Sequence, residues 1–253
     1  MTGRSLASPA AEAEPIRQTE QKIMSSRKTN IQALLARVEG DAGKIEREYN
    51  ASLHAKVIQP DLCIDIKNLF ENLRSILDYL AHDVRESYCR GANPKERFYF
   101  PVLPDKVTFD KQMDQWFPGL HSACPDLVAF LESVQQYQRN MEWLGYFNRV
   151  NNENKHGNLI EQTRSEWVET KVTSDHGGQV SWTSGVTFGE GVSIMGVPID
   201  PKTQLPVPHP SQKVERIIWV DFRFAGIDVS ALWLIKSAVS GVKSIADSMF
   251  KWL

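Results

Sequence analysis

The sequence has few cysteines, and they form no recognisable metal or redox motif. Cys63, Cys89 and Cys124 are odd in number and widely spaced, and no C-x-x-C pair occurs. This pattern argues against a disulfide scaffold and against a zinc ribbon. It is typical of proteins of the reducing cytosol, so we expect a cytoplasmic protein.

Long apolar runs are also missing. No stretch reaches the roughly 18 residues that a membrane-spanning helix requires, so we expect no membrane association. The first residues are rich in Ala, Ser, Pro and Glu and have no continuous apolar core, unlike a secretory signal. We therefore expect a disordered leader over residues 1–15.

Several common catalytic motifs are absent. The histidines are scattered, and neither H-E-x-x-H nor H-x-H occurs, which argues against a zinc hydrolase. There is no P-loop and no G-x-S-x-G nucleophile elbow. The 29 basic and 31 acidic residues nearly balance, so only a local basic site remains for binding nucleic acid. We expect no cofactor and no metal.

The first half of the chain shows helical periodicity. Apolar residues recur at helical spacing over residues 16–38 and, beyond Gly40, over 41–57, which predicts an antiparallel pair or one bent helix. The clearest helix is predicted to begin with Asp61 as its N-cap and to end near Arg90. Its apolar residues step by four and three, as in a helix packed along a bundle: Leu62, Ile66, Leu69, Leu73, Ile76 and Leu80.

A proline-containing loop over residues 91–105 follows this helix. We expect its aromatic run, Phe98, Tyr99 and Phe100, to plug the end of the bundle. Because Lys95 and Arg97 lie beside them, stacking on a nucleobase is the alternative use. Further helices are predicted over residues 106–117, 126–138 and 139–157.

From residue 159 the pattern changes to that of strands. Alternating segments over residues 164–173 and 179–188, joined by His176-Gly177-Gly178, predict a β-hairpin. Residues 214–224 give the strongest strand signal, and Asp228 is the expected cap of a last helix. The sequence thus predicts an α+β protein. A helical body covers residues 16–158, and a small antiparallel sheet with a C-terminal helix covers 159–253.

The segment 139–157 carries the constellation with most chemical meaning. Arg149, Asn152 and His156 are spaced i, i+3, i+7, so on a helix they share one face over about 10 Å. A cation, an amide and an imidazole in a row suit a phosphate, and the imidazole can act as acid or base near neutral pH. Gly157 is expected at C′, which places His156 in the last turn. The alternative is an ordinary solvated face.

Other polar residues are candidates for binding a substrate beside this face. Lys155 and Asn151 belong to the same segment. Asn72, Asp78 and His82 flank the apolar seam of the predicted 61–90 helix, and Asn72 or His82 could face the 139–157 helix and join a polar cluster. For Asp78 the alternative is a surface salt bridge to Arg74, four residues earlier.

Two resemblances attach to these residues. Arg149 followed by His156 resembles the R-x(4–6)-H pattern of the HEPN superfamily. Over roughly residues 60–160, the chain is also similar to a widespread set of uncharacterised bacterial proteins, which carry a helix like NLRSILDYLA, a segment like Phe-Pro-Val and an Asn-rich stretch ending in Lys-His. In this chain the helix-like segment begins at Asn72, the Phe-Pro-Val segment begins at Phe100, and the Asn-rich stretch ends at His156.

The first resemblance implies a small helical, usually dimeric protein. Many HEPN proteins are metal-independent ribonucleases of toxin–antitoxin and phage-defence systems, and others only bind. It implies that His156 moves a proton, that Arg149 stabilises charge on the phosphate and that Lys155 holds a flanking phosphate. The family usually has a polar residue directly after the Arg, whereas this chain has Val150, so Asn152 is the candidate for that role.

Two functional hypotheses follow. The first is a cytoplasmic RNA-binding or RNA-cleaving protein of bacterial defence, acting as a homodimer because one helix supplies a single His. The second is a non-catalytic interaction protein, whose bundle mediates dimerisation and whose sheet or last helix binds a protein partner.

Overall fold

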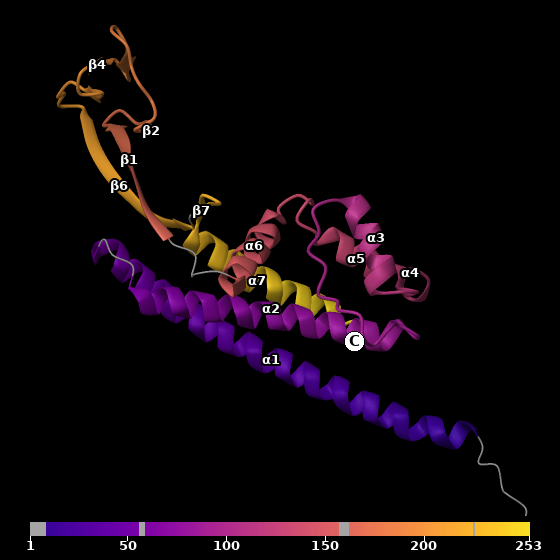
Figure 1. Cartoon of the computed structure of the whole chain (residues 1–253). Helices are drawn as coiled ribbons and strands as arrows, with labels where there is room; N and C mark the ends of the chain where they lie inside the picture. The colour runs from indigo at the N-terminus through magenta and orange to yellow at the C-terminus, as the bar shows by residue number, and fades with distance from the viewer. Residues whose placement is uncertain (1–8, 56–58, 157–161, 225) are drawn as a thin grey trace, which may run out of the picture. The chain divides into compact units, whose positions relative to one another are not determined.

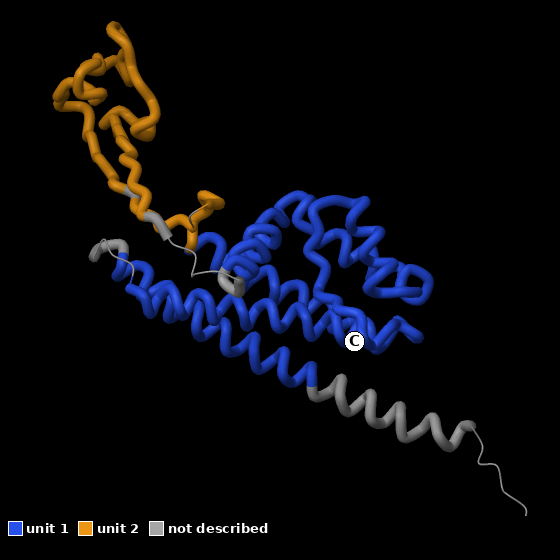
Figure 2. Tube along the Cα trace, viewed as in Figure 1, with its two compact units in different colours: residues 1–161, 232–253 blue, residues 162–231 orange. Residues whose placement is uncertain are grey.

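A computed structural model describes residues 9–55, 59–156, 162–224 and 226–253 (Figure 1). The fold is α+β, with N-terminal helices, antiparallel sheets and a C-terminal helix, which confirms the predicted class. Two compact units form: residues 1–161 with 232–253, and residues 162–231 (Figure 2). The last helix thus joins the helical unit, and the predicted boundary after residue 158 lies outside the described residues.

The first helix, α1, runs from Pro9 to Ala55 without interruption. The expected break at Gly40 is wrong, because one buried seam continues across it. A glycine inside a helix costs about 1 kcal/mol relative to Ala, less than burying one large apolar side chain contributes, about 1.5–3 kcal/mol. The helix also begins within the expected leader, whose residues 1–8 are not described. The seam consists of Ile31, Leu35, Val38, Ile45 and Tyr49.

The second helix, α2, spans Pro60–Tyr88 and confirms the predicted apolar seam, all six members of which are at most 2% exposed. It begins two positions before the prediction. Gln59 is the N-cap, Pro60 follows directly and Asp61 lies in the first turn. Proline suits the first helical position because its φ is already helical and its missing N–H has no partner to lose.

The core of the helical unit lies between four helices: α1, α2, α6 (Glu142–His156) and α7 (Ala231–Met249). Between α2 and α6, the rings of Phe70 and Phe147 meet edge to face with centroids 5.4 Å apart. Between α6 and α7, Trp143 lies so close to Gly241 that a Cβ there would come within 2.2 Å of the ring. These contacts hold α6 firmly on its apolar side.

Three shorter helices complete this unit: α3 (Lys106–Trp116), α4 (Leu120–Ala123) and α5 (Pro125–Ser133). The loop before them is anchored by the fully buried Gln135. Its amide accepts a hydrogen bond from Leu103 N at 2.9 Å and donates one to Pro101 O at 3.1 Å. Of the three loop aromatics expected to plug the bundle, Phe100 is buried and Phe98 packs on Phe117, whereas Tyr99 remains 49% exposed.

The second unit contains two antiparallel sheets. The larger has the order β2-β1-β6-β7, and the smaller has the order β3-β4-β5. The predicted hairpin is confirmed: β1 and β2 pair, and Gly177 and Gly178 have positive φ values that glycine adopts easily. The strands are β1 (Gln162–Ser174), β2 (Gln179–Thr183), β3 (Ser193–Ile194), β4 (Val197–Asp200), β5 (Leu205–Pro206), β6 (Gln212–Phe224) and β7 (Val229–Ser230).

The last helix does not begin at the expected cap. Asp228 instead accepts a hydrogen bond from Arg223 Nε at 2.6 Å, and α7 begins three residues later, after β7. Strand β7 uses these intervening residues to pair with the end of β6. Among the described helices, none combines the length and the apolar character needed to cross a membrane.

Candidate functional site

The sequence predicts a polar ridge of Arg149, Asn152 and His156 on one helix face, and α6 presents the first two of these residues on one exposed face. The Arg149 side chain is 56% exposed, and Asn152, one turn further on, is also exposed. Both line an open cavity of about 670 Å³, together with Tyr146 and Gln136. Gly145 allows Gln136 to approach α6 closely, since a Cβ there would lie 2.0 Å from the amide oxygen.

The third ridge residue, His156, is the last residue of α6. The helix therefore extends unbroken from Arg149 through this position. The side chains of Lys155 and His156, and all of Gly157, lie outside the described residues.

The ridge contains an acidic residue that the sequence analysis did not single out. Glu153 Oε1 accepts a hydrogen bond from Arg149 Nε at 2.9 Å. The i, i+4 spacing of the two residues is the signal that could have revealed this pair. Glu153 also lines the 670 Å³ cavity, so an anion that approaches Arg149 meets a neighbouring carboxylate.

Two neighbouring positions of α6 face the core instead. Val150 and Asn151 are both 0% exposed. Asn151 therefore lies away from the face of Arg149, and no described residue hydrogen-bonds to its side-chain amide. The resemblance implies a polar residue directly after the Arg. That position is Val150 here, and its side chain lies in the core, so no polar group takes this place on the exposed face.

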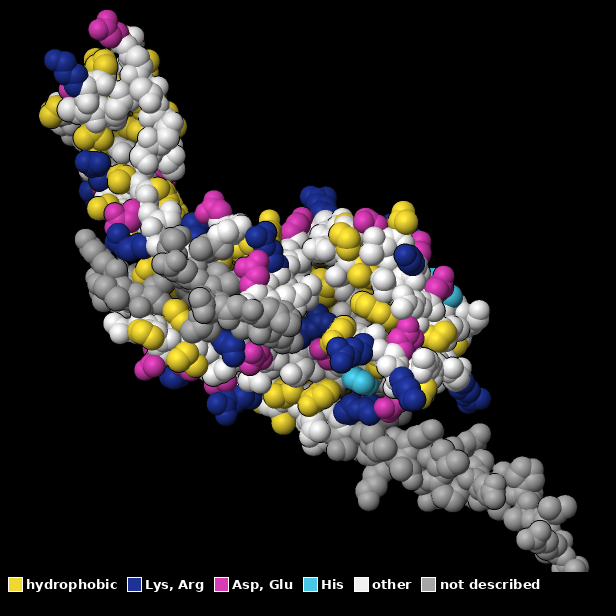
Figure 3. Space-filling view, in the orientation of Figure 1, with side chains coloured by type: hydrophobic (Ala, Val, Ile, Leu, Met, Phe, Trp, Pro, Cys, Tyr) yellow, Lys and Arg dark blue, Asp and Glu magenta, His cyan; other side chains and the backbone are white. Residues whose placement is uncertain are grey.

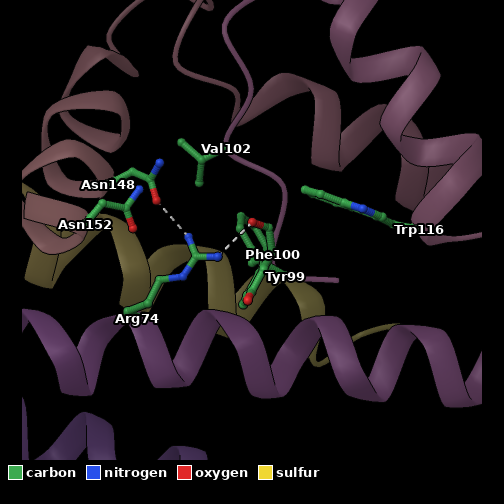
Figure 4. A pocket seen from close by; sticks show the side chains of 7 residues that line it. All are labelled: Arg74, Tyr99, Phe100, Val102, Trp116, Asn148 and Asn152. Atoms are coloured by element: carbon green, nitrogen blue, oxygen red, sulfur yellow. Dashed lines mark hydrogen bonds between the residues drawn. The ribbon is translucent and has the colours of Figure 1, made fainter. Parts of the chain in front are cut away.

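Asp78 belongs to a buried network rather than to a surface salt bridge. The Arg74 side chain is only 9% exposed, and its Nη2 lies 2.9 Å from Asp78 Oδ1. Arg74 also donates to Asn148 Oδ1 at 3.1 Å and to Phe100 O at 3.2 Å (Figure 4). Asp78 Oδ1 in turn accepts from Phe100 N at 3.0 Å. The network ties α2 to α6 and to the loop that carries the aromatic run.

Above this network is a second open cavity, of about 500 Å³ (Figure 4). Asn148 and Asn152 of α6 line one side of it, and Trp116 of α3 lies across the opening, with Tyr99 and Arg74 between them. Asn148 and Asn152 also line the 670 Å³ cavity. Trp116 was not predictable as a site residue, because α3 lies far from α6 in sequence. Asn148 lies on α6 itself, and its i, i+4 spacing from Asn152 is the signal that could have revealed it.

The two remaining predicted binding residues are not brought to these cavities. His82 packs against Phe98 with the two rings tilted by 59° and their centroids 4.5 Å apart, and it lines a third cavity of about 350 Å³ beside Cys89. Burial raises the pKa of Cys89 to about 11. Asn72 is half-buried on α2 and lines neither of the α6 cavities.

Charge around the site is mixed rather than uniformly basic. On the face of the helical unit in view, basic and acidic side chains are intermingled (Figure 3). In the part of the chain that the structure describes, no group of three or more His, Cys, Asp or Glu residues is arranged to hold a metal ion. No protein-family model, curated protein or solved structure with which the chain was compared matches it.

Proposed function

We propose that this chain is a HEPN-like cytoplasmic protein of bacteria that binds RNA along α6 and cleaves it without a metal ion, in defence or toxin–antitoxin biology. The observation that carries the proposal is the shared exposed face of Arg149 and Asn152, on the helix that ends at His156. The buried Trp143 and Phe147 fix the opposite side of the same helix in the core.

The chemistry needs a proton acceptor, a proton donor and a stabiliser of negative charge. His156 would take the proton from an RNA 2′-hydroxyl, whose oxygen then attacks the adjacent phosphorus. The bond to the 5′-oxygen breaks, and this leaving oxygen takes a proton from a second acid. Arg149 would stabilise the charge that builds up on the phosphate oxygens. In a homodimer, His156 of the second copy would be the second acid.

The Arg149–Glu153 pair is compatible with phosphate binding. An exposed i, i+4 ion pair contributes only about 0.3–0.5 kcal/mol. A phosphate of RNA can therefore replace Glu153 as the partner of Arg149 at small cost. Glu153→Gln should strengthen RNA binding and Arg149→Ala should weaken it. Asp247→Asn, the same change of charge at an exposed position of α7, should have little effect.

The decisive experiment measures cleavage of a labelled single-stranded RNA in the presence of EDTA. The wild type should release fragments with 2′,3′-cyclic phosphate ends. His156→Ala should slow cleavage by about 100-fold or more, the usual contribution of an acid or base, and still bind the strand. His121→Ala, which changes an exposed histidine of α4, is the matched control. Cleavage by His156→Ala at the wild-type rate would show that the catalytic assignment is wrong.

One observation favours the second candidate function, a non-catalytic interaction protein. Along the paired strands β1 and β6, Ile218 is 64% exposed and Val180, on the neighbouring β2, is 40% exposed. Apolar side chains on an exposed sheet face suit a protein partner. If the wild type neither binds nor cleaves RNA, and if it keeps through purification a protein partner that Ile218→Lys loses, this second function is the better account.

A further inference from the structure

The cavity between α3 and α6 contains little uncompensated charge. Arg74 is the charged residue among those that line it. Each of its three guanidinium nitrogens already has a partner: Asp78 for Nε, Asn148 for Nη1, and Asp78 together with Phe100 O for Nη2. A second anion there would have to displace a buried ion pair, which is costly. The cavity therefore suits a neutral group.

The α6 side of the cavity presents hydrogen-bonding groups whose orientation is fixed. Arginine can only donate, so Asn148 must turn its Oδ1 toward Arg74, as it does at 3.1 Å. Its Nδ2 then points away from the guanidinium, and it makes no hydrogen bond to another described residue (Figure 4). The exposed amide of Asn152, one turn along, adds a further donor and acceptor.

The opposite side presents aromatic surface. Trp116, at the C-terminal end of α3, is half-buried and extends toward the opening from the side opposite the two asparagines (Figure 4). Tyr99 meets it edge to face, with ring centroids 6.5 Å apart, and is itself 49% exposed. An indole ring across the cavity from two amides is suited to a flat group that stacks on the ring and has polar atoms along its edge.

We propose that this cavity holds one unpaired base of the bound RNA, stacked on Trp116 and hydrogen-bonded along its edge by Asn148 and Asn152. The proposal rests on the proposed function, because the phosphate next to that base would be the one that Arg149 holds. The geometry allows this, since Asn148 and Asn152 line both cavities and so connect the base site to the phosphate site.

The test measures binding separately from cleavage. Two short 2′-O-methyl RNA strands serve as probes, because they lack the 2′-hydroxyl that cleavage requires. One strand carries all its bases, and the other is abasic at every position. Base–aromatic stacking contributes enough to weaken binding by about 5- to 150-fold when it is lost. The wild type should therefore prefer the complete strand by a factor in this range.

The variants assign this preference to the cavity. Trp116→Leu should remove the preference for the complete strand and leave the affinity for the abasic strand unchanged. Trp116→Phe should keep part of the preference. Trp252→Leu, a change at a half-buried tryptophan outside this cavity, should keep all of it. Arg149→Ala should weaken binding of both strands. Circular dichroism confirms that each variant is folded.

The outcomes distinguish this proposal from the proposed function. A base preference that disappears in Trp116→Leu supports the base site, even if the wild type cleaves no RNA. A wild type that cleaves RNA but binds both strands equally overturns the base site and leaves the nuclease standing. A full preference in folded Trp116→Leu also overturns it. So does a folded wild type that binds neither strand.

Discussion

Replacing Asp78 by alanine is the strongest test of the network beneath the site. Asp78 accepts hydrogen bonds from Arg74 Nε at 3.2 Å and from Phe100 N at 3.0 Å, and it forms an ion pair with Arg74 Nη2 at 2.9 Å. The change leaves a guanidinium that is 9% exposed without its counter-charge. It also removes the acceptor of a backbone N–H in the loop that carries the aromatic residues.

The expected cost follows from burial. Removing one partner of a buried ion pair costs about 3–5 kcal/mol. Asp78 is 25% exposed, so water can enter the vacated space and the lower end of that range applies, about 3 kcal/mol. Asp78→Asn keeps the acceptor for Phe100 N and should cost less. Arg74→Met removes the buried charge and leaves a carboxylate that water reaches, so its cost should also be smaller.

The measurement is urea unfolding followed by far-UV circular dichroism, with the transition of the helical unit fitted separately because the chain forms two units. Arg37 and Asp41 supply a matched control. They have the same residue types and i, i+4 spacing and a 2.9 Å contact, but the arginine is 71% exposed. Asp41→Ala should change the free energy of unfolding by no more than about 0.5 kcal/mol.

A similar small change for Asp78→Ala and Asp41→Ala would refute the reasoning, because burial would then not separate the two pairs. The same conclusion would follow if Arg74→Met were more destabilising than Asp78→Ala. In that case the guanidinium would contribute through packing rather than through its charge. A double-mutant cycle with Arg74→Met and Asp78→Ala measures the coupling directly.

Three further predictions concern the helical unit. Gly241→Ala should destabilise it by about 1–3 kcal/mol, because the new methyl group meets the Trp143 ring at 2.2 Å, as urea unfolding would show. Gly40→Ala should stabilise it by about 0.5–1 kcal/mol in the same assay, because nothing lies within 4 Å of the new Cβ. The pKa of Cys89 is raised from 9.0 to about 11, and the thiolate is the reactive form of a cysteine. Alkylation of Cys89 at pH 8 should therefore be at least about 100-fold slower in the folded protein than in urea, as mass spectrometry would show. Its rate should rise with pH toward pH 11, and equal rates in the folded and unfolded protein would contradict this.

The parts of the fold that were predictable from the sequence depend on local periodicity. The seam of α2 recurs every three to four residues, and such spacing marks one helix face whatever packs against it. The shared exposure of Arg149 and Asn152 follows from the same rule, as does the burial of Val150 between them. The hairpin at Gly177 was predictable because two successive glycines favour a tight turn.

The rest depends on contacts between distant segments. Gly40 looked like a helix break because its propensity is poor, but the strength of the seam around it depends on packing against other helices. Asp228 looked like a helix cap, but strand pairing of the residues after it competed successfully. Trp116 reaches the site only because the loop and α3 fold back toward α6, which no local pattern of residues encodes.

The chain places an arginine with an acidic residue four positions later in two environments, and burial separates the roles of the two pairs. Arg74 and Arg149 each have an acidic residue four positions later. Arg74 is 9% exposed and is held by α2, by α6 and by a loop carbonyl, so replacing its partners would disrupt the network. Arg149 is 56% exposed, and the contact that pairs it with Glu153 costs little to exchange for a phosphate. A bound strand would therefore engage Arg149 directly, while Arg74 acts by fixing Asn148. Loss of Arg149 should accordingly weaken binding of any strand, whereas loss of Arg74 should act mainly on the preference for a base.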